Sequence, residues 1–183
     1  MQDQLIVLLK AHQPADATEA AHLQKTLDFV TRTEKCCSRQ TLAGHVTASA
    51  WILSPDRTRA LLTHHKKLNR WLQLGGHMDA DDASVQAAAT REAQEESGMH
   101  DLHLVHSALF DVDAHNIPAR QNEPEHYHYD LRFLLQAQRL DFSVSEESHD
   151  LAWVDLSTLT DEKNNISISR MAKKTLQTKH DAK

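Results

Sequence analysis

Residues 84–99 constrain the chain more than any other segment, because they place three glutamates on the apolar side of a predicted helix. At about 100° per residue, one stripe of this helix contains Val85, Ala88, Ala89, Glu92, Glu95, Glu96 and Met99. This spacing is typical of a helix that faces a core. We expect Asp82 or Ser84 to cap the start of the helix, and Gly98 to end it in left-handed geometry.

The three carboxylates require a positive partner. Burying one charge costs several kcal/mol, and like charges one helical turn apart also repel. Arg91 can pair with Glu95 but cannot neutralise all three glutamates. Because every donor is an oxygen, the pattern favours Mg²⁺ or Mn²⁺ over zinc. Taken alone, the Arg-Glu-x-x-Glu-Glu fragment is also typical of a solvated helix face.

Glycine use points to the same region. The chain has 183 residues and only four glycines, at positions 44, 75, 76 and 98. Three of them therefore lie close to the predicted helix, which indicates special backbone geometry there. The acidic stretch from Asp79 to Asp82 resembles a calcium loop, but an EF-hand starting at Asp79 would need glycine and glutamate where Ser84 and Thr90 stand.

Charge and apolar patterning limit the partners. The net charge of −6 argues against binding to nucleic-acid polymers or anionic membranes. We find no apolar run of about 20 residues and no secretory leader. Cys36 and Cys37 are adjacent, so we expect free thiols and a cytoplasmic location. The 14 histidines are scattered, and we expect most of them to be surface or core residues.

The order of elements predicts a single α/β (α+β) domain with helices packed on a sheet. Helical periodicity over 17–33, after a short apolar segment at 5–9, indicates an N-terminal helical appendage over 1–40. The main domain is expected over 41–183. Its predicted strands cover 45–53, 60–65, 71–74, 102–114, 126–138 and 151–156. A helical tail over 157–178, interrupted near Asn164 and Asn165, completes the chain.

The stretch Arg91-Glu92-Ala93-Gln94-Glu95-Glu96-Ser97-Gly98-Met99 resembles the second half of the Nudix box, the signature of the Nudix hydrolase family. The first half departs from the family pattern. Asp82 stands in place of a glutamate, and the eight residues between Asp82 and Arg91 are one more than the family has. The likeness extends over about residues 44–160. The segments GGHMD, HNIPAR and EPEHYHYD are similar to a poorly characterised bacterial subgroup.

The resemblance implies an α/β/α sandwich around a mixed β-sheet. It also implies hydrolysis of a nucleoside diphosphate linked to another moiety, by attack of water on phosphorus. Glu92, Glu95 and Glu96 would be metal ligands, with the carbonyl oxygen of Gly75 as a further ligand. Arg91 would orient a glutamate, and Glu92 or Glu96 would lie closest to the attacking water.

A later acidic residue often assists in this family. Glu147 occupies a similar position, with Glu146 as its rival, and the choice of general base between Glu96 and Glu147 stays open. An exposed acidic turn is the plain alternative at this position.

Four further residues are candidates for substrate binding. His128 and Asp130 alternate along one strand and would form a wall of the site, or else the polar outer face of a sheet. Arg120 has the geometry to bind phosphate, although it could equally be a surface residue. His77 lies in the loop of the box, where it could contact substrate or metal.

Three functions are weighed. The first is a Mg²⁺-dependent or Mn²⁺-dependent pyrophosphohydrolase acting on a small nucleotide-type substrate. The second, suggested by the altered box loop, is a non-catalytic nucleotide-sensing module. The third, an isoprenyl diphosphate isomerase, is disfavoured because neither cysteine lies in the motif. Substrate identity and oligomeric state stay open, with a homodimer possible because dimers are common in the family.

Overall fold

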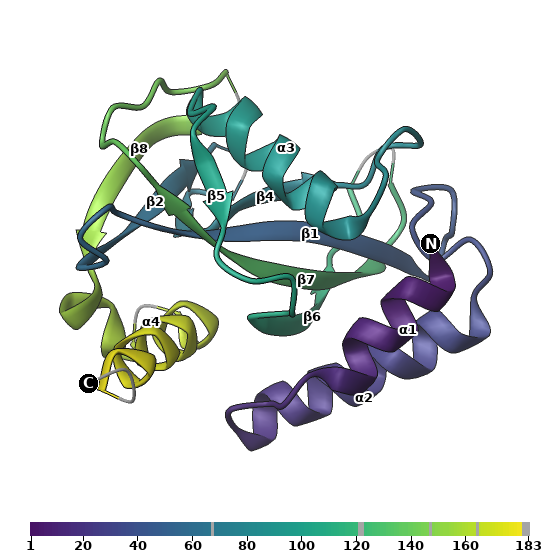
Figure 1. Cartoon of the computed structure of the whole chain (residues 1–183). Coiled ribbons are helices and arrows are strands. Elements are labelled where there is room, and N and C mark those ends of the chain that lie inside the picture. The colour runs from purple at the N-terminus through teal and green to yellow at the C-terminus, as the bar shows by residue number, and fades with distance from the viewer. Residues whose placement is uncertain (67, 121–122, 147, 164, 181–183) are drawn as a thin grey trace. The chain divides into compact units, whose positions relative to one another are not determined.

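The computed structural model describes residues 1–66, 68–120, 123–146, 148–163 and 165–180, and two groups of four strands are each flanked by helices along the chain (Figure 1). The helices are α1 (Gln2–Ala11), α2 (Ala17–Arg32), α3 (Val85–Ser97) and α4 (Ile166–His180), and the 3₁₀ helix is η1 (Leu156–Thr160). The strands are β1 (Gly44–Leu53), β2 (Arg59–His65), β3 (Arg70–Leu72), β4 (Leu74–His77), β5 (Leu102–Leu104), β6 (Asp111–Ile117), β7 (His126–Ala137) and β8 (Ser148–Asp155).

The strands are hydrogen-bonded in the order β3-β2-β1-β7-β5, with β4 on β1, β6 on β7 and β8 on β2. This sheet, with its helices, confirms the expected mixed α/β class. By internal contacts the chain divides into two units. The first comprises Met1–Ser49, Gly76–Ala89 and Ser107–Phe133, and the second comprises Ala50–Gly75, Thr90–His106 and Leu134–Lys183.

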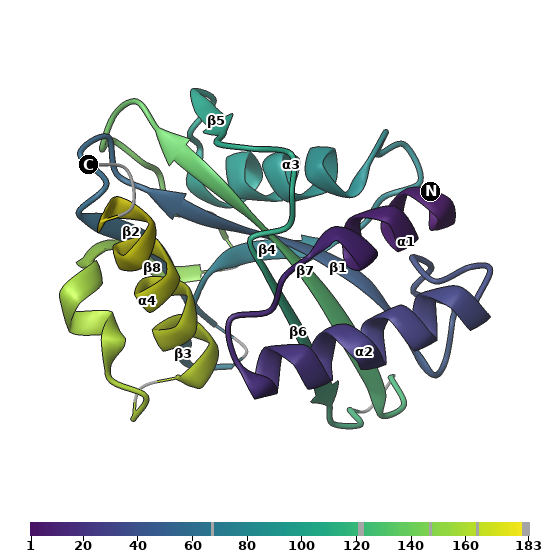
Figure 2. The same ribbon diagram turned by 60° about the horizontal axis from the view of Figure 1, so that its bottom comes forward.

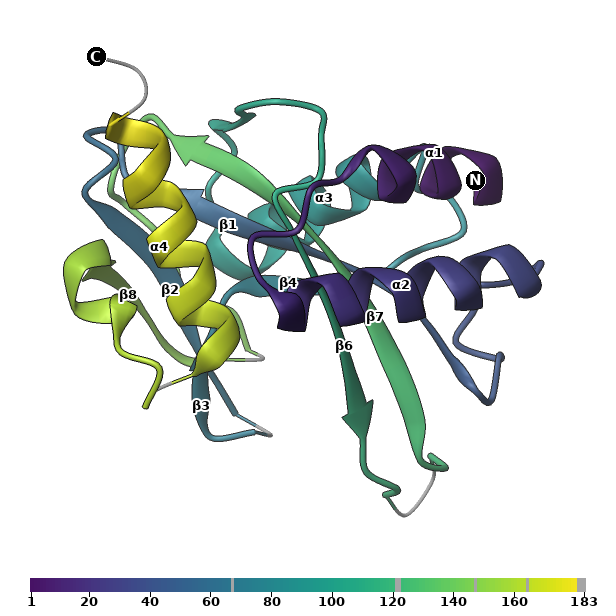
Figure 3. The same cartoon turned by 90° about the horizontal axis from the view of Figure 1, so that it is seen from below.

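In the first unit, α1 and α2 lie side by side, and β6 pairs with the first half of β7 (Figure 3). Asp16 caps α2, because its carboxylate accepts a hydrogen bond from the N–H of Glu19. Glu19 is fully buried, and it accepts hydrogen bonds from the N–H of Ala15 and from the N–H of Val112 in β6. The N-terminal helices are therefore fastened to β6. The domain boundary at residue 40 stays a prediction.

In the second unit, β2 pairs antiparallel with β1, β3 and β8. The predicted helical tail forms two helices, η1 and α4, which contact each other (Figure 2). Asn165 caps α4 by accepting a hydrogen bond from the N–H of Ser167 at 2.9 Å. The indole N–H of Trp51 donates to the hydroxyl of Thr175 at 3.0 Å, which ties α4 to the second half of β1.

Two strand predictions are corrected. The strand predicted to end at the glycine pair is two strands, β3 and β4, and β4 continues through Gly75 and Gly76 to His77. The single strand predicted over 102–114 is also two strands. Leu104 pairs with Leu135, whereas Asp111 pairs with Arg132, so the six residues 105–110 lie opposite only two residues of β7. The N–H groups of Val105 and Phe110 still donate to carbonyls of β7, and the strand is interrupted between them. No helix in the described part of the chain could cross a membrane.

Candidate active site

Helix α3 carries the predicted catalytic glutamates, and its two ends are fixed by neighbouring side chains and by backbone geometry. Ser84, rather than Asp82, caps the start, because its hydroxyl accepts a hydrogen bond from the N–H of Ala87 at 3.1 Å. Gly98 ends the helix with φ +66°, as expected for a left-handed terminus. A β-carbon at Gly98 would also meet the hydroxyl of Ser143, which would have to rotate away.

The three glutamates are not equally buried, which corrects the prediction of a single core-facing stripe. Glu96 is 7% exposed, whereas the side chain of Glu92 is 16% exposed and that of Glu95 is 59% exposed. At 3.6 residues per turn, Glu95 lies about 100° from Glu96, at the edge of the apolar stripe. Ala93, which lies on the other side of Glu96, is fully buried instead.

The second unit brings Gly75, Arg91 and the three glutamates together. The N–H of Gly75 donates a hydrogen bond to Oε2 of Glu96 at 3.3 Å. Nη1 of Arg91 donates to Oε1 of Glu92 at 3.0 Å and to Oε2 of Glu95 at 3.1 Å. Arg91 therefore orients two of the carboxylates, and the backbone N–H of Gly75 contacts the third.

The structure says less about Glu146 and Glu147, the two later acidic residues predicted to assist the reaction. Glu147 lies outside the described residues. Glu146 is exposed, and its backbone carbonyl accepts a hydrogen bond from Nζ of Lys66 at 2.5 Å.

The four predicted substrate-binding residues belong to the first unit. His77 in β4 and His128 in β7 have ring centroids 5.1 Å apart. Arg120 is exposed, and its backbone exchanges hydrogen bonds with that of Glu123. Asp130 is 3% exposed.

Asp130 belongs to a buried charge network that the sequence reasoning missed. Its carboxylate accepts hydrogen bonds from the hydroxyl of Ser49 at 2.8 Å and from Nε of Arg132 at 2.7 Å. Arg132 also pairs with Asp111 at 3.1 Å and with Asp113 at 3.2 Å. The carboxylate of Asp130 is thus engaged by protein donors. The signal was present in the sequence, because residues 128, 130 and 132 alternate onto one face of a strand.

A hydrogen bond within the loop that precedes α3 connects an acidic side chain of the loop to the loop's own backbone. Oδ2 of Asp82, the residue that replaces the family's glutamate, accepts a hydrogen bond from the N–H of Asp79 at 2.8 Å. The substituted residue therefore stabilises the loop locally.

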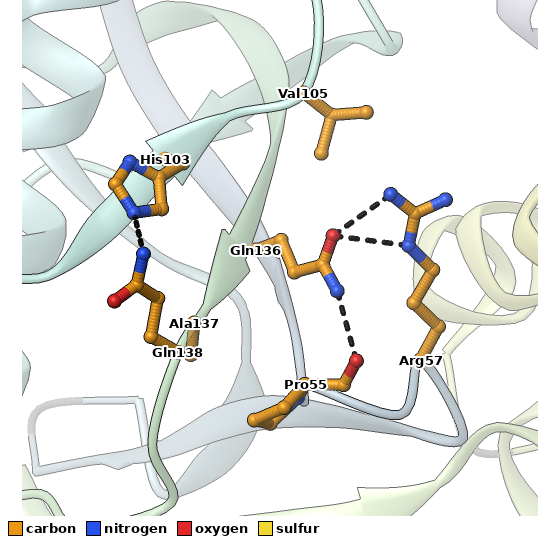
Figure 4. A pocket seen from close by; sticks show the side chains of 7 residues that line it. All are labelled: Pro55, Arg57, His103, Val105, Gln136, Ala137 and Gln138. Atoms are coloured by element: carbon orange, nitrogen blue, oxygen red, sulfur yellow. Dashed lines mark hydrogen bonds between the residues drawn. The ribbon is translucent and has the colours of Figure 1, made fainter.

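A surface pocket of about 560 Å³ contains none of the predicted site residues (Figure 4). Its lining residues come from the second unit and are Pro55, Arg57, His103, Val105, Gln136, Ala137 and Gln138. The amide oxygen of Gln136 accepts two hydrogen bonds from Arg57, and its amide nitrogen donates to the carbonyl of Pro55. The polar groups of this pocket largely bond one another, so we assign it no catalytic role.

Comparison with known proteins decides the family. A family model of the NUDIX domain matches residues 44–174, which include Gly75 and all of α3. The chain belongs to the NUDIX family. This membership confirms the enzyme class expected from the sequence, a pyrophosphohydrolase. Nudix hydrolases act on small nucleotide-type molecules and generally use divalent metal ions. No curated protein matches this chain.

Solved structures share the NUDIX fold with this protein. An Ap4A hydrolase from C. elegans, solved as a binary complex, is 17% identical with a TM-score of 0.58, and the match covers 74% of this chain and 98% of that one. A MutT NUDIX hydrolase from Burkholderia pseudomallei is 24% identical with a TM-score of 0.53, covering 69% and 97%. A NUDIX-family hydrolase from Clostridium perfringens is 24% identical with a TM-score of 0.52, covering 70% and 96%.

Proposed function

We propose that this NUDIX protein is a divalent-metal-dependent hydrolase that cleaves a pyrophosphate bond in a nucleoside diphosphate linked to another moiety, by attack of water on phosphorus. The observation that carries the proposal is the buried carboxylate of Glu96, which is 7% exposed and accepts a hydrogen bond from the N–H of Gly75. A buried carboxylate beside two further carboxylates is costly unless a cation balances the charge.

The donor set fits a hard cation. Glu92, Glu95 and Glu96, with the carbonyl oxygen of Gly75, would hold the ion, and all of these donors are oxygens, which Mg²⁺ and Mn²⁺ prefer. When bound, the ion neutralises charge on phosphate oxygens and acidifies the attacking water.

The protein's own groups complete the reaction in this proposal. Glu96 or Glu147 accepts the proton of the attacking water. Arg91 holds Glu92 and Glu95 through the two hydrogen bonds described above, so that neither carboxylate needs to reorient during the reaction.

Direct substrate recognition is assigned to His77, Arg120 and His128. The fourth predicted residue, Asp130, is buried with its carboxylate engaged by Ser49 and Arg132, so we do not propose that it contacts substrate. Arg120 is exposed and would bind a phosphate group through its planar guanidinium. The small nucleotide-type substrate, the cytoplasmic location and the homodimer stay predictions.

The experiment is a substrate panel assayed with Mg²⁺ or Mn²⁺ in ¹⁸O-labelled water. The panel contains a nucleoside triphosphate, a dinucleoside polyphosphate, a nucleoside diphosphate sugar, a dinucleotide and a coenzyme with a pyrophosphate group. We expect turnover of at least one compound, with ¹⁸O incorporated into a phosphate of one product. That label also identifies which phosphorus is attacked.

The panel separates the enzyme from the non-catalytic sensor. A sensor would bind a panel compound, shown by calorimetry, without turning it over and without a requirement for metal. If the protein hydrolyses none of the compounds in the panel, the proposed reaction is contradicted.

A further inference from the structure

Histidines from three strands converge in the first unit. His45 is the second residue of β1, His77 ends β4 and His128 lies near the start of β7. Each ring offers a nitrogen, and these nitrogens lie within 4.8 Å of one another. The ring centroid of His45 lies 4.9 Å from that of His77 and 4.8 Å from that of His128. Three ring nitrogens this close can face one shared ion.

His45 is the most telling member of this histidine cluster. It is 3% exposed, and neither of its ring nitrogens has a hydrogen-bond partner among the residues that the structure describes. A buried polar group left without a partner costs free energy, and a bound ion would remove that cost. Burial, with the neighbouring His77 and His126, lowers the pKa of His45 to about 4. The ring is therefore neutral at pH 7, the form in which imidazole binds metals.

His126 lies beside the cluster with a defined tautomer. Its Nδ1 donates a hydrogen bond to the carbonyl oxygen of Pro124 at 2.8 Å, because a carbonyl can only accept. In the neutral ring, Nε2 of His126 then carries a lone pair, and it lies 3.2 Å from Nε2 of His128. Two nitrogens bound to one tetrahedral zinc ion are about 3.3 Å apart, given zinc–nitrogen bonds near 2.0 Å.

We propose that His45, His77 and His128 bind a borderline divalent transition-metal ion, with zinc as the first candidate and His126 as the neighbouring fourth donor. Neutral imidazole nitrogens are favoured ligands of zinc, whereas the carboxylates of α3 suit Mg²⁺ or Mn²⁺. The two sites therefore differ in donor chemistry. This proposal does not depend on the proposed hydrolase activity.

The test is the zinc content of the protein itself. Untagged protein is stripped with a chelator, dialysed against zinc in excess Mg²⁺ to occupy the carboxylates, and analysed for bound metal. We expect one zinc per chain in the wild type. The same content is expected in Glu96→Gln, which changes the carboxylate site, and in His100→Gln, which replaces an exposed histidine outside the cluster.

Substitutions within the cluster supply the decisive comparison. We expect His45→Gln and His128→Gln to weaken zinc binding at least about a hundredfold, measured by competition with a chromogenic chelator. His128 is only half-buried, so its variant serves where His45→Gln fails to fold. Wild-type protein without bound zinc, or a folded His128→Gln variant with wild-type affinity, would overturn the proposal.

X-ray absorption at the zinc edge gives an independent readout. Imidazole ligands produce characteristic multiple-scattering features, and we expect these from the wild-type protein loaded with one equivalent of zinc. A spectrum with oxygen ligands alone would place the ion elsewhere and overturn the assignment.

Discussion

The backbone N–H of Gly75 donates a hydrogen bond to Oε2 of Glu96, with 3.3 Å between nitrogen and oxygen. The two residues are separated by 21 positions, so this bond connects Gly75 to the C-terminal end of α3. It holds the buried carboxylate beside backbone that has no side chain to obstruct an ion. The relationship joins the two halves of the Nudix box in space.

Replacing Gly75 by alanine should strain this connection. Gly75 has φ +148°, a region that residues with a β-carbon rarely adopt, whereas Gly76 is not among the positive-φ glycines. We expect Gly75→Ala to lower the free energy of unfolding by about 1–3 kcal/mol, measured by urea denaturation. Gly76→Ala is the matched control. An equal loss in both variants would show that backbone geometry at Gly75 is not special.

Arg132 should be essential for stability, because three buried or nearly buried carboxylates surround it. Arg132→Met leaves them without their shared cation, and we expect a loss of about 3–5 kcal/mol in the free energy of unfolding. Arg139 makes an exposed pair with Asp101 at 2.8 Å, so Arg139→Met should cost less than about 1 kcal/mol. Similar denaturation midpoints for the two variants would contradict this account of the network.

The same network predicts how stability depends on pH. Burial raises the pKa of Asp113, but Arg132, with His115 and His22, outweighs burial and holds that pKa well below its usual value. The native state therefore binds fewer protons than the unfolded state, whose aspartate pKa is about 3.9. The stabilisation is present above about pH 4 and is lost as the pH falls below it.

Unfolding free energies of the wild type and of Asp113→Asn, measured from pH 7 down to pH 3, check this prediction. The wild-type curve should fall more steeply below about pH 4. Parallel curves would mean that Asp113 titrates in the native state as it does in the unfolded chain.

Much of the fold follows from local sequence signals, and the exceptions depend on distant partners. The N-cap aspartate at position 16 and the glycine at position 98 mark their helix ends locally. The break between β5 and β6 was not predictable, because residues 102–114 carry continuous strand-like character. What divides them is their registers on β7, a strand that follows later in the chain.

The candidate site shows the same division. Helical spacing identified Glu96 as a core-facing carboxylate, because one helix face depends only on local periodicity. His45 was not singled out, since a lone histidine at the start of a β-rich segment has no local signal of a partner. Its neighbours His77 and His128 come from other strands, and only strand pairing brings the three rings together.

Glu19 tests whether the N-terminal helices are an appendage or part of the first unit's core. It is fully buried, and its carboxylate lies 2.8 Å from Nε2 of His12 and 3.2 Å from the N–H of Val112. We expect Glu19→Ala to lower the free energy of unfolding by at least about 2 kcal/mol. Glu34→Ala, at an exposed position, should be nearly neutral. A Glu19→Ala effect no larger than that control would favour a dispensable appendage.

The Mg²⁺ dependence of kcat in the wild type, in Glu96→Gln and in Glu34→Gln tests the central claim most directly. The best substrate of the panel is used, and urea denaturation shows that each variant is folded. The account predicts saturable Mg²⁺ activation of the wild type and of Glu34→Gln, and a loss of about a hundredfold or more in Glu96→Gln. A folded Glu96→Gln variant with wild-type kcat at saturating Mg²⁺ would contradict the account.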